Sequence, residues 1–252
     1  MTSLAGRTAL ITGGGSGLGA AIAGILHGAG AEVVLVGRDE AKLSSVASEL
    51  GDRARWETCD VADPASVDEL RARLTDAEVS ILVNNAGVPG PVADLVDISV
   101  AEWDDVFDIN VRGVFLLCRA FLPAMFERGA GDVINIASVS GKRPLIHRTP
   151  YCASKMAVIG LTSTLAFEAG PKGVSVNTLS PGPVAGARMQ RNFRLEAERS
   201  GGSPADAEAV FVSRSALGRM VTEEEVGRAV LAMLGMPGLC GADVDLSAGM
   251  VA

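Results

Sequence analysis

Short apolar segments alternate with helical segments along the whole of this 252-residue chain, and this alternation constrains its fold more than any other feature. Most of the apolar segments are nearly continuous runs of Val, Ile and Leu, which is typical of parallel strands covered on both faces. The pattern therefore predicts an α/β fold built on a doubly wound parallel sheet of about seven strands. The strand candidates are 7–12, 32–37, 54–58, 79–84, 132–137, 173–179 and 242–246.

Helical candidates lie between these strands. Two of them begin with clear start signals, because Asp63-Pro64 precedes one and a capping-box pattern of Thr222 and Glu225 precedes the last. No linker, composition break or internal repeat divides the chain, so residues 1–252 are expected to form a single domain with helices on both faces of the sheet. The helical candidates are 18–29, 39–50, 64–76, 102–128, 152–169 and 222–235.

Composition and charge exclude several classes of function. The 22 basic and 30 acidic residues give a net charge of −8, which makes nucleic acid a poor partner. With two histidines, no multi-histidine metal centre is expected. The four cysteines form no C-x-x-C pair, which is typical of free thiols in a reducing compartment. The apolar stretch 8–31 contains eight glycines and follows no basic leader, so we expect a cytoplasmic protein without a signal peptide or membrane span.

Segment 188–215 interrupts the alternation shortly after a Pro-Gly-Pro turn at 181–183. The segment is polar and rich in Arg and Ser, and it follows the carboxyl end of a predicted strand. Because open α/β sheets bind their ligands at that edge, the segment is predicted to be a substrate lid. A surface excursion without a functional role is the alternative.

A glycine-rich loop at 12–19 directly follows the first predicted strand and opens the first helix. Glycines there let the chain turn tightly and bring backbone N–H groups close to a pyrophosphate. No Lys-Ser/Thr pair follows, which excludes a P-loop for nucleoside triphosphates. The loop therefore predicts a dinucleotide site in a Rossmann-type fold, with a purely structural turn as the alternative. Its candidate cofactor contacts are Gly13, Ser16, Gly17, Leu18 and Gly19.

The spacing of this loop, T-G-x-x-x-G-x-G, resembles that of the short-chain dehydrogenase/reductase family. Later motifs follow in that family's order, and the resemblance covers essentially the whole chain. It implies a nicotinamide-dependent oxidoreductase. The later motifs are Asn84-Asn85-Ala86-Gly87, Asn110, Ser138, Tyr151-Cys152-Ala153-Ser154-Lys155 and Pro181-Gly182.

Gly37 and Arg38 stand at the end of the second predicted strand, where NAD-using relatives carry an acidic residue that binds the ribose hydroxyls. A glycine removes the carboxylate that would repel a 2′-phosphate, and the Arg38 guanidinium supplies a partner for it. NADP(H) is therefore the expected cofactor, and NAD(H) is the alternative because Asp39 is close enough to contact the ribose. By resemblance, further cofactor contacts are Asp60, Val61, Asn85, Ala86, Gly87, Pro181, Gly182 and Val184.

Tyr151 and Lys155 are four residues apart at a helix start, so their side chains project from one face. A free phenol ionises only near about pH 10, and a nearby ammonium together with the positive nicotinamide ring stabilises the phenolate. Tyr151 would then donate a proton to a carbonyl oxygen or remove one from an alcohol, while Ser138 hydrogen-bonds the same oxygen. By resemblance, Lys155 also reaches the nicotinamide ribose, and Asn110 holds a water that relays protons to Lys155.

Gly186 departs from the family pattern, which commonly places a threonine there to hold the nicotinamide carboxamide. Backbone N–H groups around Val184 are the expected replacement, and a displaced lid is the alternative. Cationic residues surround the predicted site and suggest an anionic or 3-oxoacyl thioester substrate. Solvated or subunit-interface charges are the interpretation favoured for them from sequence alone. These residues are Lys142, Arg143, His147, Arg148, Arg188, Arg191 and Arg194, of which His147, Arg148 and Arg188 are the candidate substrate contacts.

The sequence thus predicts hydride transfer between NADP(H) and a ketone or secondary alcohol. Members of the family that it resembles also include NAD-dependent sugar, polyol and steroid alcohol dehydrogenases, which are the alternative. A nicotinamide-binding sensor without turnover is a rival from another class, and it would be expected to show a damaged catalytic set, whereas this set is complete. By resemblance, the partner is a small molecule, and the chain forms a homo-oligomer, commonly a tetramer built through 102–128, 152–169 and the C-terminal segment.

Overall fold

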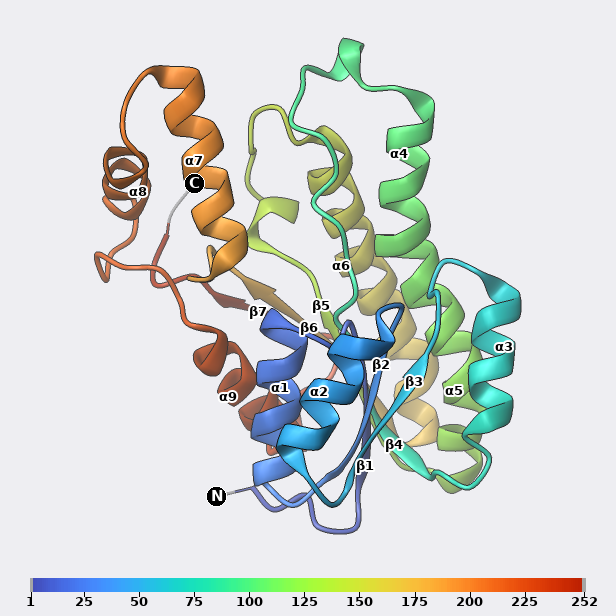
Figure 1. Cartoon of the computed structure of the whole chain (residues 1–252). Coiled ribbons are helices and arrows are strands. Elements are labelled where there is room, and N and C mark those ends of the chain that lie inside the picture. Colours follow the sequence, from blue (N-terminus) through green and yellow to red (C-terminus); the bar gives the residue numbers. More distant parts are fainter. Residues whose placement is uncertain (1, 251–252) are drawn as a thin grey trace.

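A computed structural model describes residues 2–250, with the side chains of Ala187, Arg188 and Arg199 outside the description. Its strands are β1 (Thr8–Thr12), β2 (Glu32–Gly37), β3 (Ala54–Thr58), β4 (Val79–Asn84), β5 (Gly131–Ile136), β6 (Val174–Pro181) and β7 (Asp243–Leu246). They form a seven-stranded, fully parallel sheet in the order β3-β2-β1-β4-β5-β6-β7 (Figure 1). The predicted doubly wound α/β sheet is confirmed, and each strand lies within two residues of its expected bounds.

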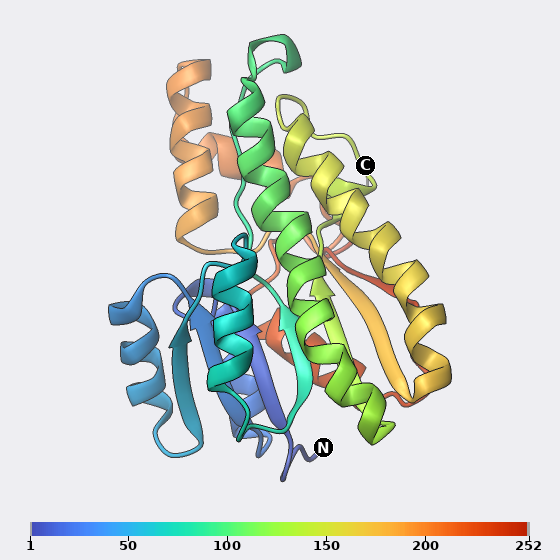
Figure 2. The same ribbon diagram turned by 90° about the vertical axis from the view of Figure 1, so that its right-hand side faces the viewer.

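Helices cover both faces of the sheet (Figures 1 and 2). One face packs against α1 (Gly17–Gly28), α2 (Glu40–Leu50) and α9 (Glu223–Leu234). The other packs against α3 (Pro64–Arg73), α5 (Gly113–Arg128) and α6 (Thr149–Ala169). Side chains alternate between these two cores along each central strand: Leu10 points into one, and Ile11 points into the other. Both are fully buried, and each such side chain contributes about 2 kcal/mol by leaving water.

The long helix expected at 102–128 is divided by a π-helical turn. α4 (Val100–Phe107) begins with a capping box of Ser99 and Glu102, and the turn at Asp108–Arg112 then leads into α5. The whole run Val100–Arg128 is long and apolar enough to span a membrane, but 56% of its most apolar stretch is buried inside the protein. That burial is typical of a core helix. Sequence periodicity does not reveal a π turn, which is often found at functional sites.

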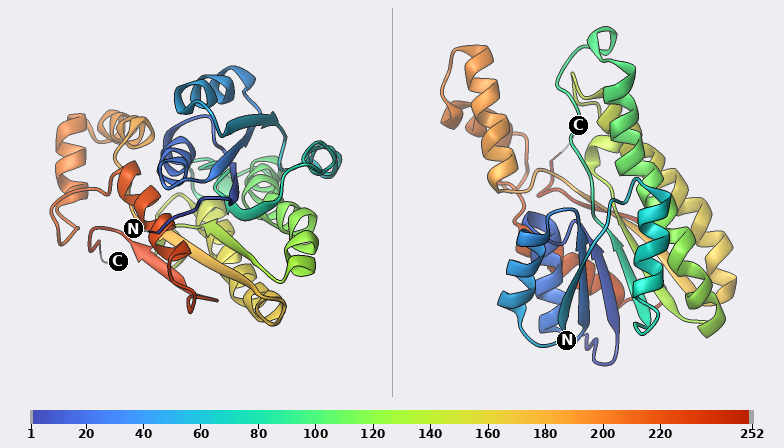
Figure 3. Two further views of the ribbon diagram at one scale, coloured as in Figure 1. Left: turned by 90° about the horizontal axis from the view of Figure 1, so that it is seen from below. Right: turned by 45° about the vertical axis from the view of Figure 1, so that its right-hand side comes forward.

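Segment 188–215 folds largely into two helices that sequence analysis did not assign, α7 (Ala187–Ser200) and α8 (Pro204–Val212). Phe193 of α7 is buried and meets Phe211 of α8 edge to face, with ring centres 5.6 Å apart. The pair stands above the carboxyl edge of the sheet, opposite the upper end of α4 (Figure 3). This is the place that a lid over the site would occupy.

Candidate active site

The glycine-rich loop joins β1 to α1 at the carboxyl edge of the sheet. Gly13 and Gly17 have φ angles of +67° and +50°, which glycine adopts without strain. A Cβ at Gly19 would collide with the carbonyl oxygen of Gly13, so the loop can fold back closely on α1. Ser16 precedes α1, and within the described part of the chain its side chain makes no capping bond to the first turn. The N–H groups of that turn therefore suit phosphate oxygens, and the residues present fit a dinucleotide.

Thr12 ties this loop to the 85–87 segment, although sequence analysis did not single it out as a site residue. Its hydroxyl oxygen accepts hydrogen bonds from the backbone N–H groups of Asn85 and Ala86, both at 3.0 Å. The Asn85 side chain donates in return to the Thr12 carbonyl at 2.9 Å. These bonds fix the ends of β1 and β4 side by side, beneath the loop predicted to hold the cofactor. The one available sequence signal was a threonine at the end of an apolar strand, immediately before the glycines.

Arg38 and Asp39 follow β2 and differ in what they can offer a ligand. Asp39 caps α2: its carboxylate forms an ion pair with the side chain of Lys42 at 2.9 Å and accepts from the Lys42 backbone at 3.1 Å. These bonds lower the pKa of Asp39 below its usual value. Arg38 is exposed, and the described structure contains no hydrogen bond or ion pair from its side chain. The guanidinium is thus available to an anion, while the carboxylate is engaged at the helix start.

The predicted adenine contacts lie at the end of the neighbouring strand. The Asp60 carboxylate accepts a hydrogen bond from the Ala62 backbone at 3.0 Å, and the Asp60 N–H donates to the Ser66 hydroxyl at 3.0 Å. Val61 is buried in the core beneath. These bonds hold the turn that follows β3, the strand beside β2, which ends at Gly37 immediately before Arg38.

Lys155 is a buried cation, 5% exposed, at the start of α6. Its Nζ donates to the carbonyl oxygen of Ile136 at 2.8 Å and lies 5.8 Å from the centre of the Tyr151 ring. A Cβ at Gly87 would lie 3.5 Å from the same Nζ, so the segment that follows β4 also reaches this ammonium. The helix start and the carboxyl ends of β4 and β5 thus converge on one charge.

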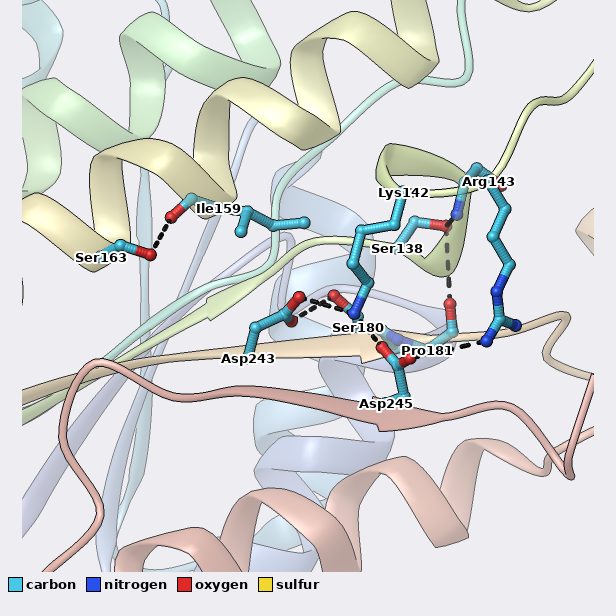
Figure 4. Close-up of polar contacts among 10 residues, drawn as sticks. Ser138, Lys142, Arg143, Ile159, Ser163, Ser180, Pro181, Asp243 and Asp245 are labelled. Carbon is cyan, nitrogen blue, oxygen red and sulfur yellow. Dashed lines mark hydrogen bonds and ion pairs between the residues drawn. The ribbon is translucent and has the colours of Figure 1, made fainter. Parts of the chain in front are cut away.

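Ser138 lies two residues beyond Ile136 and begins a single 3-10 turn, η3 (Val139–Gly141). Its oxygen accepts from the Ser140 N–H at 3.2 Å, and the hydroxyl donates to the Pro181 carbonyl at 3.5 Å (Figure 4). A Cβ at Gly141 would lie only 2.9 Å from the backbone nitrogen of Met156, so the turn packs directly on α6. This packing brings the serine turn to the helix that carries Tyr151 and Lys155.

Asn110 lies in the π turn, fully buried. Its side-chain oxygen accepts from the Val88 N–H at 2.8 Å, while its amide donates to the Val88 carbonyl and to the Ser154 hydroxyl, both at 3.0 Å. The Ser154 hydroxyl donates onward to the Tyr151 carbonyl at 2.8 Å. Asn110 thus fixes the loop after β4 to the start of α6, and its predicted water relay to Lys155 stays a prediction.

A chain of buried amides and hydroxyls beneath the site was not predicted. Asn84 donates to the Asn135 side-chain oxygen at 2.8 Å, Asn135 donates to Thr162 at 2.9 Å, and Thr162 donates to the Val158 carbonyl at 2.8 Å. These bonds join β4, β5 and α6 inside the core. The signal was present in the sequence as single asparagines within otherwise apolar strands.

The turn after β6, where backbone N–H groups around Val184 are expected to hold the carboxamide, is tied to neighbouring segments. The Gly182 N–H donates to the Leu246 carbonyl at 2.8 Å, and Val184 forms a parallel bridge with Val221. A Cβ at Gly186 would lie 3.0 Å from the carboxylate oxygen of Glu223, so a threonine would be crowded there. Glu223, which sequence analysis did not single out, therefore occupies the space beside the turn.

Three of the seven cationic residues around the site face aspartates. Lys142 pairs with Asp243 at 2.7 Å and also with Asp245, which Arg143 approaches at 3.7 Å. His147 Nε2 lies 3.2 Å from the Asp94 carboxylate. The Arg148 guanidinium lies 5.8 Å from the centre of the Tyr151 ring. Arg191 and Arg194 are exposed on α7, and the side chain of Arg188 lies outside the described residues.

Comparison with known proteins identifies relatives of this chain. The family described as short chain dehydrogenase matches residues 7–198. An uncharacterized oxidoreductase of Staphylococcus aureus is 41% identical over 187 residues, which are 73% of this chain and 80% of that protein. D-threitol dehydrogenase of Mycolicibacterium smegmatis is 42% identical over 184 residues, which are 71% of this chain and 70% of that enzyme.

Two solved structures share the fold over nearly the full length. A variant of actinorhodin polyketide ketoreductase with NADPH has a TM-score of 0.93 and 32% identity, covering 99% of each chain. NAD⁺-bound xylitol dehydrogenase has a TM-score of 0.91 and 26% identity, covering 98% of this chain and 99% of the other.

Proposed function

Because this chain belongs to the short-chain dehydrogenase family and is an oxidoreductase acting on CH–OH and C=O groups, we propose that it transfers a hydride between NADP(H) and a ketone or secondary alcohol. The observation that carries the proposal is the buried ammonium of Lys155 beside the Tyr151 ring, with the Ser138 turn packed on the same helix. A sensor without turnover has no need of these three groups together.

The chemistry divides among the residues as follows. When bound, the nicotinamide supplies or accepts the hydride. The Tyr151 hydroxyl donates a proton to the carbonyl oxygen in reduction and removes it in oxidation, and the positive charge of Lys155 stabilises the phenolate. The Ser138 hydroxyl forms only a long 3.5 Å bond to the Pro181 carbonyl, so it can turn to the substrate oxygen as negative charge develops there.

The end of β2 supports NADP(H) as the cofactor. A 2′-phosphate needs a cation and no competing carboxylate, and Arg38 is exposed there while Asp39 is paired with Lys42. The NADPH carried by the polyketide ketoreductase agrees with this proposal, whereas the NAD⁺ of xylitol dehydrogenase represents the alternative.

Cofactor preference is tested by comparing kcat/KM and Kd for NADPH and NADH. Arg38→Ala removes a charge-assisted bond of about 1.5–3 kcal/mol, so NADPH should bind roughly 10- to 150-fold more weakly, with little change for NADH. Arg228→Ala, which removes an exposed α9 arginine paired with Glu224, is the matched control. A strong preference for NADH, or equal weakening of both cofactors by Arg38→Ala, would contradict the assignment.

We further propose an uncharged hydroxylated substrate, such as a polyol and its ketose. Lys142, Arg143 and His147 each face an aspartate, which weakens the argument for an anionic thioester and leaves it to the arginines of the set. The similarity to D-threitol dehydrogenase supports the polyol class. A panel of D-threitol, xylitol and acetoacetyl-coenzyme A tests the choice, and turnover of any member also excludes a sensor. Preferred turnover of the thioester, with KM raised by Arg148→Ala for that substrate alone, would select the 3-oxoacyl reductase instead.

A further inference from the structure

A cluster of charges fastens the serine turn to the last strand of the sheet. We propose that Lys142, Asp243 and Asp245 are positioning residues for Ser138, holding its hydroxyl where the substrate oxygen must be met. The inference rests on the proposed role of Ser138 in stabilising that oxygen. None of the three residues needs to contact substrate or cofactor for this purpose.

The members of the cluster lie close together (Figure 4) and are partly shielded from water. The Lys142 ammonium lies between two carboxylates, 2.7 Å from Asp243 and in direct contact with Asp245. The other oxygen of Asp243 accepts a hydrogen bond from the fully buried Ser180 hydroxyl at 2.6 Å. The Asp243 side chain is 17% exposed and that of Lys142 is 30% exposed, so solvent screens this pair less than a surface ion pair.

The titration of Lys142 agrees with a persistent link. Partial burial acts to lower the pKa of Lys142, but hydrogen bonds from its ammonium to Asp243 and Asp245 outweigh that effect and raise the pKa above its usual value. The ammonium therefore stays charged wherever the enzyme is folded and near neutrality.

The cluster reaches Ser138 through the backbone of one short turn. Ser138 begins η3 and Lys142 ends it: the Gly141 N–H donates to the Ser138 carbonyl at 2.9 Å, and the Lys142 N–H donates to the Val139 carbonyl at 3.0 Å. A displacement of Lys142 must therefore move the turn that Ser138 starts. On its far side, Gly141 already packs against α6, so the turn is held between that helix and β7.

The partner of the Ser138 hydroxyl is held by the same cluster. Pro181, whose carbonyl accepts from Ser138, directly follows Ser180, which bonds to Asp243. In the β6–β7 pairing, Ser180 lies opposite Asp245. The cluster thus fixes both ends of the Ser138–Pro181 bond, which a cluster serving only to join β7 to the sheet would not need to do.

A double-mutant cycle tests the proposal. Lys142→Met is made in the wild type and in Ser138→Ala, with kcat measured on the panel substrate that has the highest kcat/KM with NADPH. We expect Lys142→Met to lower kcat about 10- to 100-fold in the wild type, which is part of the 10²- to 10³-fold loss of kcat that removal of such a hydrogen-bond donor causes. In Ser138→Ala, the same substitution should lower kcat by less than about twofold. NADPH affinity should stay within about twofold of the wild type, because the cluster does not touch the dinucleotide loop. Lys172→Met, at an exposed lysine beside the Phe126 ring, is the matched control.

The kcat values of this cycle decide whether Lys142 has the proposed positioning role. An unchanged kcat in Lys142→Met, or an equal loss in both backgrounds, would overturn the positioning role while leaving the proposed function intact. Full turnover by Ser138→Ala alone would overturn both. If Lys142→Met does not fold, Asp245→Asn, which removes one of the two carboxylates, enters the same cycle with the same expected result.

Discussion

Thr12→Val tests how the predicted cofactor loop is held, because valine keeps the shape of threonine and removes its oxygen. Thr12 is 2% exposed, and its hydroxyl oxygen accepts hydrogen bonds from two backbone N–H groups, those of Asn85 and Ala86, both at 3.0 Å. An unsatisfied buried donor costs about 1–3 kcal/mol, and these two donors are half-buried, so the lower part of that range applies to each. We therefore expect the free energy of unfolding in urea to fall by about 2–3 kcal/mol.

The matched control is Thr8→Val, at the other end of the same strand. Thr8 is also buried, 7% exposed, and its hydroxyl makes no hydrogen bond among the residues that the structure describes. Any gain from the extra methyl group appears in both variants and cancels in the difference. Thr12→Val should also weaken NADPH binding more than Thr8→Val does, because the 85–87 segment is loosened. A difference in stability below about 0.5 kcal/mol between the two variants would refute the role assigned to this hydroxyl.

Two further predictions concern titrating groups. Hydrogen bonds from Arg219 at 2.7 and 2.8 Å, followed by a backbone bond, lower the pKa of Glu225 from 4.5 to about 2. This carboxylate therefore stabilises the fold above about pH 4.5 and stops doing so as the pH falls towards 2. Glu225→Gln should therefore make the free energy of unfolding in urea depend less on pH between about pH 5 and 3. An unchanged slope of that free energy against pH would contradict this. Burial raises the pKa of Cys118 to about 12, so Ellman's reagent at about pH 8 should label exposed Cys240 and spare Cys118 until unfolding. Modified Cys118 in a peptide map of the native protein would be inconsistent with that burial.

The strands were predictable because each is a nearly continuous apolar run between turn residues, and burial on both faces requires such runs. The helices α7 and α8 were not predicted, since α7 buries mainly Phe193 and Ala197 among polar residues, and no strand follows to mark its end. The division of the long helix at Asn110 was not predicted from the sequence either. A π turn changes backbone hydrogen bonding without leaving a clear mark in composition.

Within the candidate site, motif order predicted Ser138, Tyr151 and Lys155 as catalytic residues, because each follows or begins a recognisable element. The interaction partners of the residues around the site could not be predicted from the sequence. The aspartates that neutralise Lys142 lie about one hundred residues further along the chain, so local sequence shows a cation but not its ion pair. The same holds for Glu223 beside Gly186: the glycine was visible as a departure from the family pattern, whereas the carboxylate next to it was not.

Tyr151→Phe tests the central claim most directly, because Tyr151 is the only tyrosine in the chain. The substitution removes one oxygen, the atom proposed to exchange a proton with the substrate. We expect kcat on the panel substrate to fall by about 10²- to 10⁴-fold, while NADPH, followed by its fluorescence, binds with nearly the wild-type Kd. Turnover by Tyr151→Phe at close to the wild-type rate would contradict the account.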